Sequence, residues 1–393
     1  MISVDEAQAR LLALASQLPA ITHPLAKAAR HYLHGPLEAI RTQPAANLSA
    51  MDGYAVIAAD FPGPWRVIGE SAAGHPFSGA LSQGEAVRIF TGAHVPQNAD
   101  VILIQENTTR DGAYVSATQI LPPMPGTHIR RAGSDFKAGT EILRRGILLG
   151  PGPIALAAMA GHGTLRVGQW PRVAIVATGD ELALAGATCS PVQIPSSNSP
   201  MLHAMLSDYP CETVDAGIIS DNLAELETKL EDLTKRADII VTTGGASVGD
   251  HDLIQTALKN IGANMDFWKV AMRPGKPLMA GKIGNTIVLG LPGNPSSAFV
   301  TAFLFLLPLI RHMAGCLTPL PELFEAVSAT ALPEGGARAE YLRARIDGAV
   351  ITPLTGQDSG LTAPLAYANA LLLQPPHVRP RAMGTEVQYL RLS

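Results

Sequence analysis

The sequence is poor in cysteine and carries little net charge. Its 393 residues contain three cysteines, Cys189, Cys211 and Cys316, which lie far apart and form no C-x-x-C pair. This spacing gives no sign of a disulfide framework or a cysteine-based zinc site, and it fits a reducing compartment. The formal net charge of -4 gives no strong basic field for nucleic acid, although a local basic pocket could still hold a small anion. We therefore expect a cytoplasmic protein with no nucleic acid partner.

Long uninterrupted apolar runs are also missing. The amino-terminal segment, residues 1–17, carries Asp5, Glu6 and Arg10 among regularly spaced apolar residues, which predicts an amphipathic helix and not a secretory signal. The most apolar stretch, residues 298–310, is shorter than the roughly 20 residues of a spanning helix and contains Pro308. The sequence predicts a buried helix there and no membrane span.

Two common nucleotide-binding signatures are absent from the sequence. It has no G-x-x-x-x-G-K-[ST] motif and no G-x-G-x-x-G that opens a helix after a strand, so neither a P-loop ATPase nor a dinucleotide oxidoreductase is supported. No fixed-period repeat is present either, which excludes solenoids and propellers. Apolar residues make up 47% of the chain, and at roughly 150 residues per domain its length predicts two or more domains.

The first half of the chain is predicted to contain an inserted domain. Residues 47–135 are rich in glycine, proline and short β-branched runs, which predicts a small β-rich domain. Residues 1–46 and 136–170 flank it, and we expect them to form one discontinuous, elongated helical linker domain. Pro153 and Gly161 are suited to begin and end a second helix, which we expect to return beside the amino-terminal one.

The second half is predicted to hold two further domains. In residues 171–318, apolar strands alternate with helices, which predicts a doubly wound, mostly parallel α/β domain. The strands are expected at residues 172–178, 237–243 and 285–290, and the helices at residues 199–207 and 296–310. Residues 319–393 return to short alternating runs separated by glycine and proline, which predicts a C-terminal β domain.

Polar residues follow the ends of the predicted α/β strands, where ligands bind in such sheets. Thr178-Gly-Asp-Glu-Leu182 ends the first strand, and its two carboxylates suit Mg²⁺ binding or acid-base chemistry. Taken alone, Asp180 or Glu181 could equally well cap the next helix.

The second strand ends in a glycine-rich turn that runs from Gly244 to Asp252. Its backbone N–H groups could hold a phosphate, and it contains two acids, Asp250 and Asp252. His251 between them could ligate a metal, but a single histidine without a partner at a diagnostic spacing is more often a solvated loop residue.

Two further loops carry features of an anion site. Arg273 and Lys276 lie in a loop stiffened by Pro274, Gly275 and Pro277, and rigidly held cations suit a fixed anion. The loop of residues 291–297 leads into the most apolar helix, whose free N–H groups would face an anion. Four such strand ends in one domain suggest a nucleotide or phosphate ester bound with Mg²⁺.

Seven motifs, in order along the whole chain, resemble the molybdopterin molybdenumtransferase family, which includes the E domain of gephyrin. They are Ser49-Ala-Met-Asp-Gly-Tyr-Ala55, Arg88-Ile-Phe-Thr-Gly92, Arg131-Ala-Gly-Ser-Asp135, Thr178-Gly-Asp-Glu-Leu182, Gly244-Gly-Ala-Ser-Val-Gly249, Arg273-Pro-Gly-Lys-Pro277 and Leu291-Pro-Gly-Asn-Pro295. The resemblance implies an elongated homodimer of four-domain chains with a β-barrel-like terminal domain. It also implies an active site in a cleft between the subunits.

The family resemblance implies a reaction as well. The substrates would be molybdate and adenylylated molybdopterin, which the related molybdopterin adenylyltransferase would supply. A divalent cation, Mg²⁺, would support hydrolysis of the adenylate with release of AMP. The molybdopterin-binding domain would then be the α/β domain, residues 171–318.

The resemblance assigns roles to individual residues. Glu181, Asp250 and Asp252 would hold Mg²⁺ or position water, and Asp238 also matches a catalytic position of the family. Arg273 and Lys276 would neutralise charge on the leaving group. The other predicted substrate-binding residues are Gly244, Gly245, Ser247, Pro292, Gly293, Asn294, Arg338 and Ser359, with Arg343 as a further anion contact.

Three residues in or beside the inserted domain, Asp52, Thr91 and Asp135, match family positions needed for metal insertion. They would reach the substrate in the partner subunit, or else they serve only turn and cap chemistry. The sequence also departs from the family at Ala246, Asp250, Arg273, the additional Ala337, and Asp358, where glycine is usual.

Two other functions share these features. A gephyrin-like scaffold would keep the fold without catalysis, but nothing in the chain resembles the appended receptor-clustering regions, and the acids and cations are present. A free-standing molybdopterin adenylyltransferase would need only the α/β domain, whereas this chain has all four. Metal insertion is therefore the predicted function.

Overall fold

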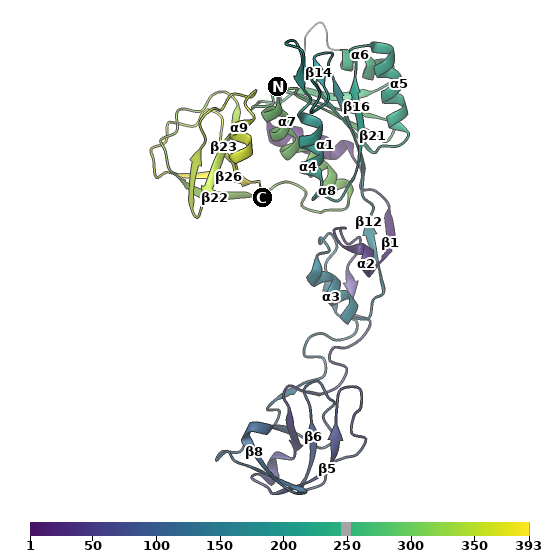
Figure 1. Cartoon of the computed structure of the whole chain (residues 1–393), viewed down its shortest axis with the longest axis vertical. Coiled ribbons are helices and arrows are strands. Elements are labelled where there is room, and N and C mark those ends of the chain that lie inside the picture. Colours follow the sequence, from purple (N-terminus) through teal and green to yellow (C-terminus); the bar gives the residue numbers. More distant parts are fainter. Residues whose placement is uncertain (245–252, 393) are drawn as a thin grey trace.

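The computed structural model describes residues 1–244 and 253–392. The chain is elongated, with an α/β body and a terminal β barrel side by side at one end (Figure 1). A narrow linker leads from the α/β body to a separate β-rich unit at the opposite end. This arrangement confirms the predicted multidomain fold class.

The α/β body is built on a mostly parallel sheet in which β20 runs opposite to the other strands. The strand order is β16 (Glu212–Ile219), β13 (Arg172–Thr178), β17 (Ile239–Thr243), β21 (Thr286–Leu291), β20 (Pro277–Ile283) and β18 (Asn264–Lys269). The first four strands are parallel to one another, and β20 and β18 run antiparallel to their neighbours. A short ribbon, β14 (Leu182–Ala183) with β15 (Ile194–Pro195), follows β13.

Helices cover both faces of this sheet. Along β13, Val173 and Ile175 belong to the core under α4 (Asn198–Leu206), whereas Ala174 and Val176 point to the core under α5 (Leu223–Thr234) and α6 (Leu253–Asn260). Alternate residues of a strand face opposite sides of a sheet, so near-continuous apolar strands are buried on both faces. The doubly wound prediction is confirmed.

The most apolar helix runs without a break from Pro295 to Met313. It comprises α7 (Pro295–Thr301), a π-helical turn (Ala302–Leu306) and α8 (Leu307–Met313). A π turn is a usual way to fit an irregularity into a helix, and here it directly precedes the segment with Pro308. The helix is therefore longer than predicted, and its 19 residues are long and apolar enough to cross a membrane. Because 83% of its most apolar part is buried inside the protein, it is a core helix, and the predicted burial is confirmed.

The amino-terminal helix belongs to the α/β body. Ser3 accepts a hydrogen bond from the N–H of Glu6 at 3.1 Å and so caps α1 (Val4–Leu14). Its apolar face, Val4, Ala7 and Leu11, is buried in the core of the sheet. The prediction that this helix pairs with the one following Pro153 is wrong, because the sheet and α8 already cover its apolar face.

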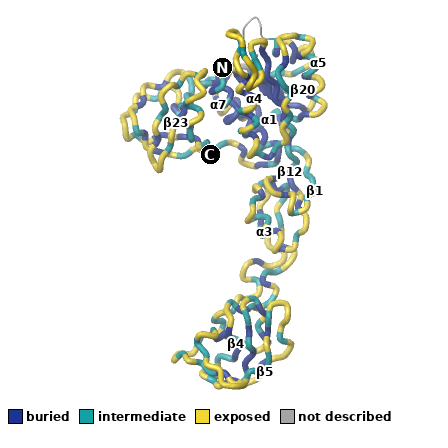
Figure 2. Tube along the Cα trace, viewed as in Figure 1, coloured by how far each residue is buried: buried dark blue, intermediate teal, exposed yellow. Residues whose placement is uncertain are grey.

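The linker is helical only in part. Its antiparallel ribbon joins β1 (Ala20–Pro24) to β12 (Thr164–Gly168), and a second short pair joins β2 (Leu37–Glu38) to β11 (Glu141–Leu143). Helix α3 (Pro151–Met159) contacts α2 (Leu25–Ala28) and β11. The paired strands β1 and β12 connect the body to the linker, so the connection is narrow (Figure 2).

The inserted unit is a mixed sheet with two small cores. Its strand order is β7 (Val101–Ile104), β4 (Gly53–Val56), β6 (Glu85–Ile89), β5 (Trp65–Ser71), β9 (Tyr114–Ala117) and β8 (Thr108–Asp111). Trp65 is fully buried at the centre of one core. Two 3₁₀ turns (Ala58–Asp60 and Gln105–Asn107) and the pair β3 (Leu48–Ser49) with β10 (Ile129–Arg130) complete the unit.

The terminal unit is a closed barrel. Strands β23 (Ala339–Asp347), β24 (Val350–Pro353), β22 (Leu323–Ser328), β26 (Glu386–Arg391) and β25 (Ala370–Gln374) pair in that order, and β25 pairs back to β23. Helix α9 (Ala363–Tyr367) precedes β25. Strand β19 (Met272–Arg273) of the α/β body pairs with the start of β23, which attaches the barrel beside the carboxyl ends of the parallel strands. The barrel-like prediction is confirmed.

Candidate active site

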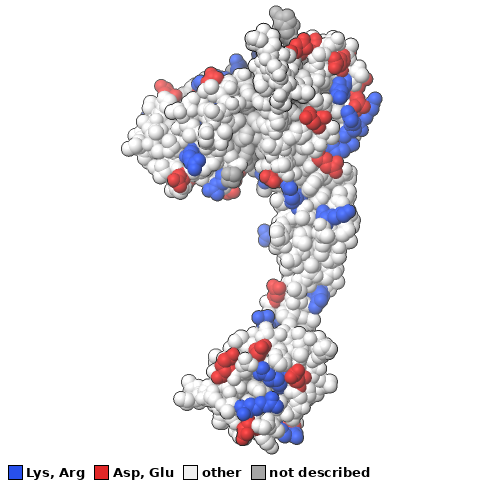
Figure 3. Space-filling view, viewed as in Figure 1, with Lys and Arg blue, Asp and Glu red and all other residues white. Residues whose placement is uncertain are grey.

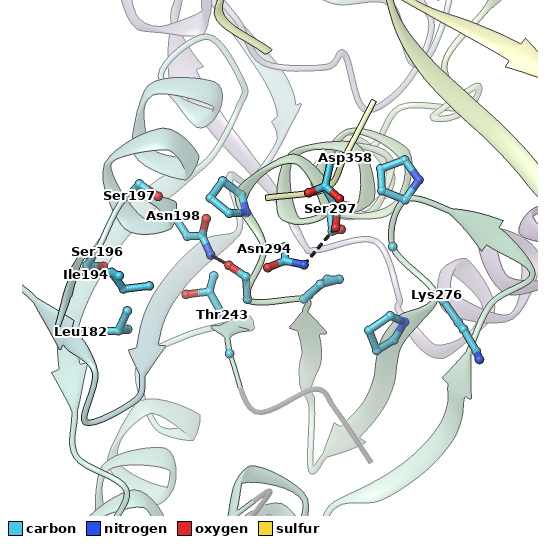
Figure 4. A pocket seen from close by; sticks show the side chains of 18 of the residues that line it. Leu182, Ile194, Ser196, Ser197, Asn198, Thr243, Lys276, Asn294, Ser297 and Asp358 are labelled. Atoms are coloured by element: carbon cyan, nitrogen blue, oxygen red, sulfur yellow. Dashed lines mark hydrogen bonds between the residues drawn. The ribbon is translucent and has the colours of Figure 1, made fainter. Parts of the chain in front are cut away.

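A cavity of about 650 Å³ lies at the carboxyl ends of β13, β17 and β21, and a loop of the terminal barrel forms one wall (Figure 4). Its polar and charged lining residues are Thr178, Glu181, Ser196, Ser197, Asn198, Thr243, Arg273, Lys276, Asn294, Ser297, Arg338, Gln357, Asp358 and Ser359. Gly244, Pro292 and Gly293, also predicted to bind substrate, line it as well. The strand-end loops therefore converge as the sequence predicts.

Glycine at position 244 allows these turns to pack against one another. Gly244 has a φ of 95°, and an added Cβ would lie 2.6 Å from the carbonyl oxygen of Thr178. The turn at Gly293 also lies close to Gly244. A larger residue at position 244 would force the ends of β13 and β17 apart.

The two acids after β13 have different surroundings. The carboxylate of Glu181 folds back over Gly179, whose φ is 141°, so closely that a Cβ there would collide with it. Asp180 instead binds Asp221: its Oδ1 accepts from the N–H of Asp221 at 3.0 Å. Glu181 lines the cavity and Asp180 does not. The chain continues into β14 and not into a helix, so neither acid is a helix cap.

The helix that begins at Pro295 turns its amino terminus to the cavity. The N–H of Ala298 donates to Asn294 O at 2.9 Å, and the N–H of Ser296 donates to Ser359 O at 3.3 Å. Pro295 has no N–H, so the N–H of Ser297 is the first-turn donor without a partner among the described residues. The Ser297 side chain also lines the cavity, although the residue is only 4% exposed. This turn suits an anionic ligand.

Two asparagines fix the loop that leads into this helix. Asn198 Nδ2 donates to Gly293 O at 2.7 Å, and Asn294 Nδ2 donates to Ser359 Oγ at 3.0 Å (Figure 4). The Oδ1 atom of Asn198 is buried and has no partner among the described residues. The sequence gives no sign of this role for Asn198, since an asparagine at the start of a helix is usually a cap.

Three cations line the cavity: Arg273, Lys276 and Arg338. Arg273 is exposed and pairs loosely with Glu340, with Nη1 and Oε1 3.5 Å apart. Arg338 is half-buried, and its Nη1 lies 3.4 Å from Met272 O. The Lys276 side chain extends away from Asn294 and Ser297 (Figure 4), so this cation borders the cavity and does not fill it.

The structure corrects the role expected of Arg343. The residue is fully buried and is not part of the cavity wall. Its Nη2 donates to the carbonyl oxygens of Gly356 at 2.9 Å and Asp358 at 3.0 Å. Arg343 therefore holds the barrel loop that carries Ser359, and its contact with the site is indirect.

Several predicted site residues lie away from the cavity. Asp238 directly precedes β17, at the amino-terminal ends of the parallel strands and so opposite the cavity. Its carboxylate pairs bidentately with Arg172, with Nη2 and Oδ1 2.9 Å apart. Asp52 and Thr91 are exposed in the inserted unit, at the opposite end of the molecule from the α/β body (Figure 1), and Asp135 is exposed where this unit joins the linker, with its N–H bonded to Gln43 O.

The remaining predictions fall outside the described residues. They are Gly245, Ser247, Asp250 and Asp252, together with Ala246 and His251. Within residues 1–244 and 253–392, no three histidine, cysteine or acidic side chains are grouped closely enough to hold a metal ion. Glu181 is thus the member of the predicted Mg²⁺ set that the structure places.

In the inserted unit, Thr91 holds the carboxylate of Asp52. The backbone N–H and the hydroxyl of Thr91 both donate to Asp52 Oδ1, at 2.7 and 2.9 Å. These bonds favour the ionised form, the backbone bond most, and lower the pKa of Asp52 below its ordinary value. They stabilise the fold above the ordinary carboxyl pKa, and this contribution is lost as pH falls through the lowered value.

Replacing Thr91 with valine is expected to raise the Asp52 pKa part of the way back, because the shape and the backbone bond remain while the hydroxyl bond is lost. A carboxyl ¹³C NMR titration of both proteins measures this change. An unaltered Asp52 titration would contradict the assigned contact, and Asp111, which is exposed elsewhere in the same unit, serves as the reference resonance.

Three family models match the chain in succession. The MoeA N-terminal region (domain I and II) matches residues 2–161, a probable molybdopterin binding domain matches residues 174–312, and the MoeA C-terminal region (domain IV) matches residues 325–392. A Haemophilus influenzae protein named molybdopterin molybdenumtransferase is 34% identical over 87% of this chain and 85% of its own length. The chain belongs to the molybdopterin molybdenumtransferase family.

Other relatives agree with this membership, which confirms the resemblance seen in the seven motifs. The Staphylococcus aureus (strain COL) protein of the same name is 31% identical over 99% of this chain and 95% of its own. A crystal structure of the Pyrococcus horikoshii molybdopterin biosynthesis MoeA protein superposes with a TM-score of 0.84 and 25% identity, covering 100% of this chain and 99% of that one. The protein is thus an enzyme of molybdenum cofactor biosynthesis.

Proposed function

We propose that this protein transfers molybdenum from molybdate to adenylylated molybdopterin and releases AMP. The observation that carries the proposal is the cavity itself, which Glu181, three cations and a helix terminus with a free N–H line together in a member of this family. A phosphate ester would bind through the free N–H of Ser297 and the cationic border, since both favour negative charge.

The described residues fit a Mg²⁺ ion that takes part of its ligands from the protein and the rest from the substrate and water. Mg²⁺ commonly takes one or two carboxylates and completes its shell with phosphate oxygens and water. Glu181 supplies a carboxylate at the cavity, and Asp250 and Asp252 of the following strand end are proposed as the others. Bound there, the ion would polarise the phosphate linkage and activate water.

In this proposal the remaining residues bind and orient the substrate. Arg273, Lys276 and Arg338 would balance the charge that develops as AMP leaves. Asn294 and Ser359 would keep the helix terminus open toward the ligand through their mutual hydrogen bond. Gly244, Gly245 and Ser247 would contact the phosphate from the end of β17.

We also propose that the protein acts as a homodimer. Every residue of α3 is apolar or glycine, yet Ala157 is its single buried residue, and Met159 is 48% exposed. Leu148 beside it is 47% exposed, and few charged side chains lie over this part of the linker (Figure 3). An exposed apolar surface of this kind usually marks a protein interface.

A dimer would explain why some predicted site residues lie far from the cavity of their own chain. The inserted unit, which carries Asp52 and Thr91, lies at the opposite end of the molecule from the α/β body, and Asp135 lies where this unit joins the linker (Figure 1), so these residues could act only on a partner's substrate. Asp238, paired with Arg172, would support the sheet from its other edge. We further propose a cytoplasmic location, a molybdopterin adenylyltransferase as the supplier of substrate, and domain boundaries after residues 46, 135, 170 and 318, with α1 counted in the α/β body.

The decisive measurement is AMP release from adenylylated molybdopterin and Mg²⁺, with and without molybdate. We expect release that depends on molybdate. No release from a substrate that still binds would favour a scaffold role instead, and release that is indifferent to molybdate would argue against metal transfer.

A further inference from the structure

We propose that Asp358 is a residue of the binding cavity that weakens the binding of oxyanions there. Its carboxylate comes from the terminal barrel and lines the cavity together with Asn294 and Ser297 (Figure 4). Its negative charge would oppose the binding of an oxyanion at the start of the Pro295–Met313 helix. The inference rests on the proposed function only in that the cavity binds an oxyanion.

Hydrogen bonds from the interior of the barrel hold the loop that carries Asp358. Buried Arg343 binds the carbonyl oxygens of Gly356 and Asp358. Gln357 closes the same turn, because its Oε1 accepts from the N–H of Arg343 and its Nε2 donates to Arg343 O, at 3.0 and 2.9 Å. The backbone at Asp358 therefore has little freedom to swing away from the cavity.

The side chain is fixed as well. Asp358 Oδ1 accepts a hydrogen bond from the N–H of Gly360 at 2.8 Å. The next residue, Ser359, accepts from Asn294 through its hydroxyl and from the N–H of Ser296 through its carbonyl. The loop is thus attached directly to the first turn of the helix, and Asp358 lines the same cavity as Ser297, whose N–H is the free donor of that turn.

A fixed carboxylate at this place has a definite electrostatic effect. It takes up part of the favourable potential of the helix terminus, and it repels an oxyanion that enters the cavity. The side chain is exposed, so water screens the repulsion and the effect is modest. We expect about a two- to fivefold loss of oxyanion affinity at low salt, as for other exposed charge contacts.

The test uses the full-length protein and the variant Asp358→Asn, with molybdate and AMP as separate probes in calorimetric titrations without divalent cation. Asparagine keeps the Oδ1 acceptor for Gly360 and removes only the charge. We expect the variant to bind both probes about two- to fivefold more tightly in low salt, with little difference at ~1 M salt, where the Debye length is about 3 Å. Asp358→Glu should retain weak binding.

Asp347→Asn is the matched control, because it removes an exposed acid from the far end of β23 in the same barrel and does not line the cavity. Unchanged or weaker anion binding by Asp358→Asn would overturn the inference, and so would an equal gain in Asp347→Asn. The proposed function fails separately: if wild-type protein releases no AMP with molybdate while Asp358→Asn still binds the anions more tightly, the inference stands and the assigned reaction does not.

Discussion

Replacing Glu181 with glutamine is expected to lower molybdate-dependent AMP release by at least about a hundredfold, the scale on which a carboxylate contributes as an acid, base or metal ligand. Glu181 is the acid of the β13 end that lines the cavity, and its carboxylate folds over Gly179. Glutamine keeps the size of the side chain and removes the charge. Initial rates of AMP release at saturating molybdate and Mg²⁺ measure the effect.

The preceding residue, Asp180, offers a matched control. Its side chain accepts from the N–H of Asp221 outside the cavity, so Asp180→Asn should release AMP at close to the wild-type rate. Both side chains are exposed, and we expect stability changes within about 0.5 kcal/mol for each variant. A fully active Glu181→Gln protein, or an equal loss in Asp180→Asn, would refute the role given to Glu181.

Mixed dimers of Glu181→Gln and Asp52→Asn subunits are expected to regain activity that neither variant has alone. In a shared site, the cavity of one subunit works with the inserted unit of the other. A mixed dimer then contains one site with both defects and one with none. Random pairing yields about half mixed dimers, each with one working site of two, so about a quarter of wild-type activity should return.

The experiment needs two differently tagged chains produced together and a tandem purification, with sedimentation to establish the dimer. The purified mixed dimer itself should then reach about half of the wild-type rate. Mixed dimers without activity would show that Asp52 does not complete the cavity of a partner. A monomeric wild-type protein would contradict the proposal that the exposed apolar surface of α3 forms a homodimer interface.

The sequence predicted the elements of the α/β body well because their signals are local. Apolar runs such as Val173 to Val176 alternate with helices, and glycine with polar residues follows each strand. Parallel strands place these polar ends at one edge, so the convergence of Glu181, Gly244 and Asn294 followed from the pattern alone. The predicted Arg273 and Lys276 lie at the same edge for the same reason.

The errors concern contacts between parts of the chain that lie far apart in sequence. The apolar face of α1 is compatible with any apolar partner, and only the folded chain shows that the sheet takes it. Arg343 matched an anion-binding motif, yet long-range packing buries it beneath the loop of Gly356 and Asp358. Asn198 gave no signal, because its partner, Gly293, lies 95 residues away.

The sequence by itself determined the family, the order of the elements and the residue types at each strand end, since periodicity and turn chemistry act over a few residues. Tertiary structure alone decided which of two adjacent acids faces the cavity, which arginine supports it, and that Asp358 lines it. Those outcomes depend on burial and hydrogen bonds between segments brought together by folding, and no local pattern encodes them.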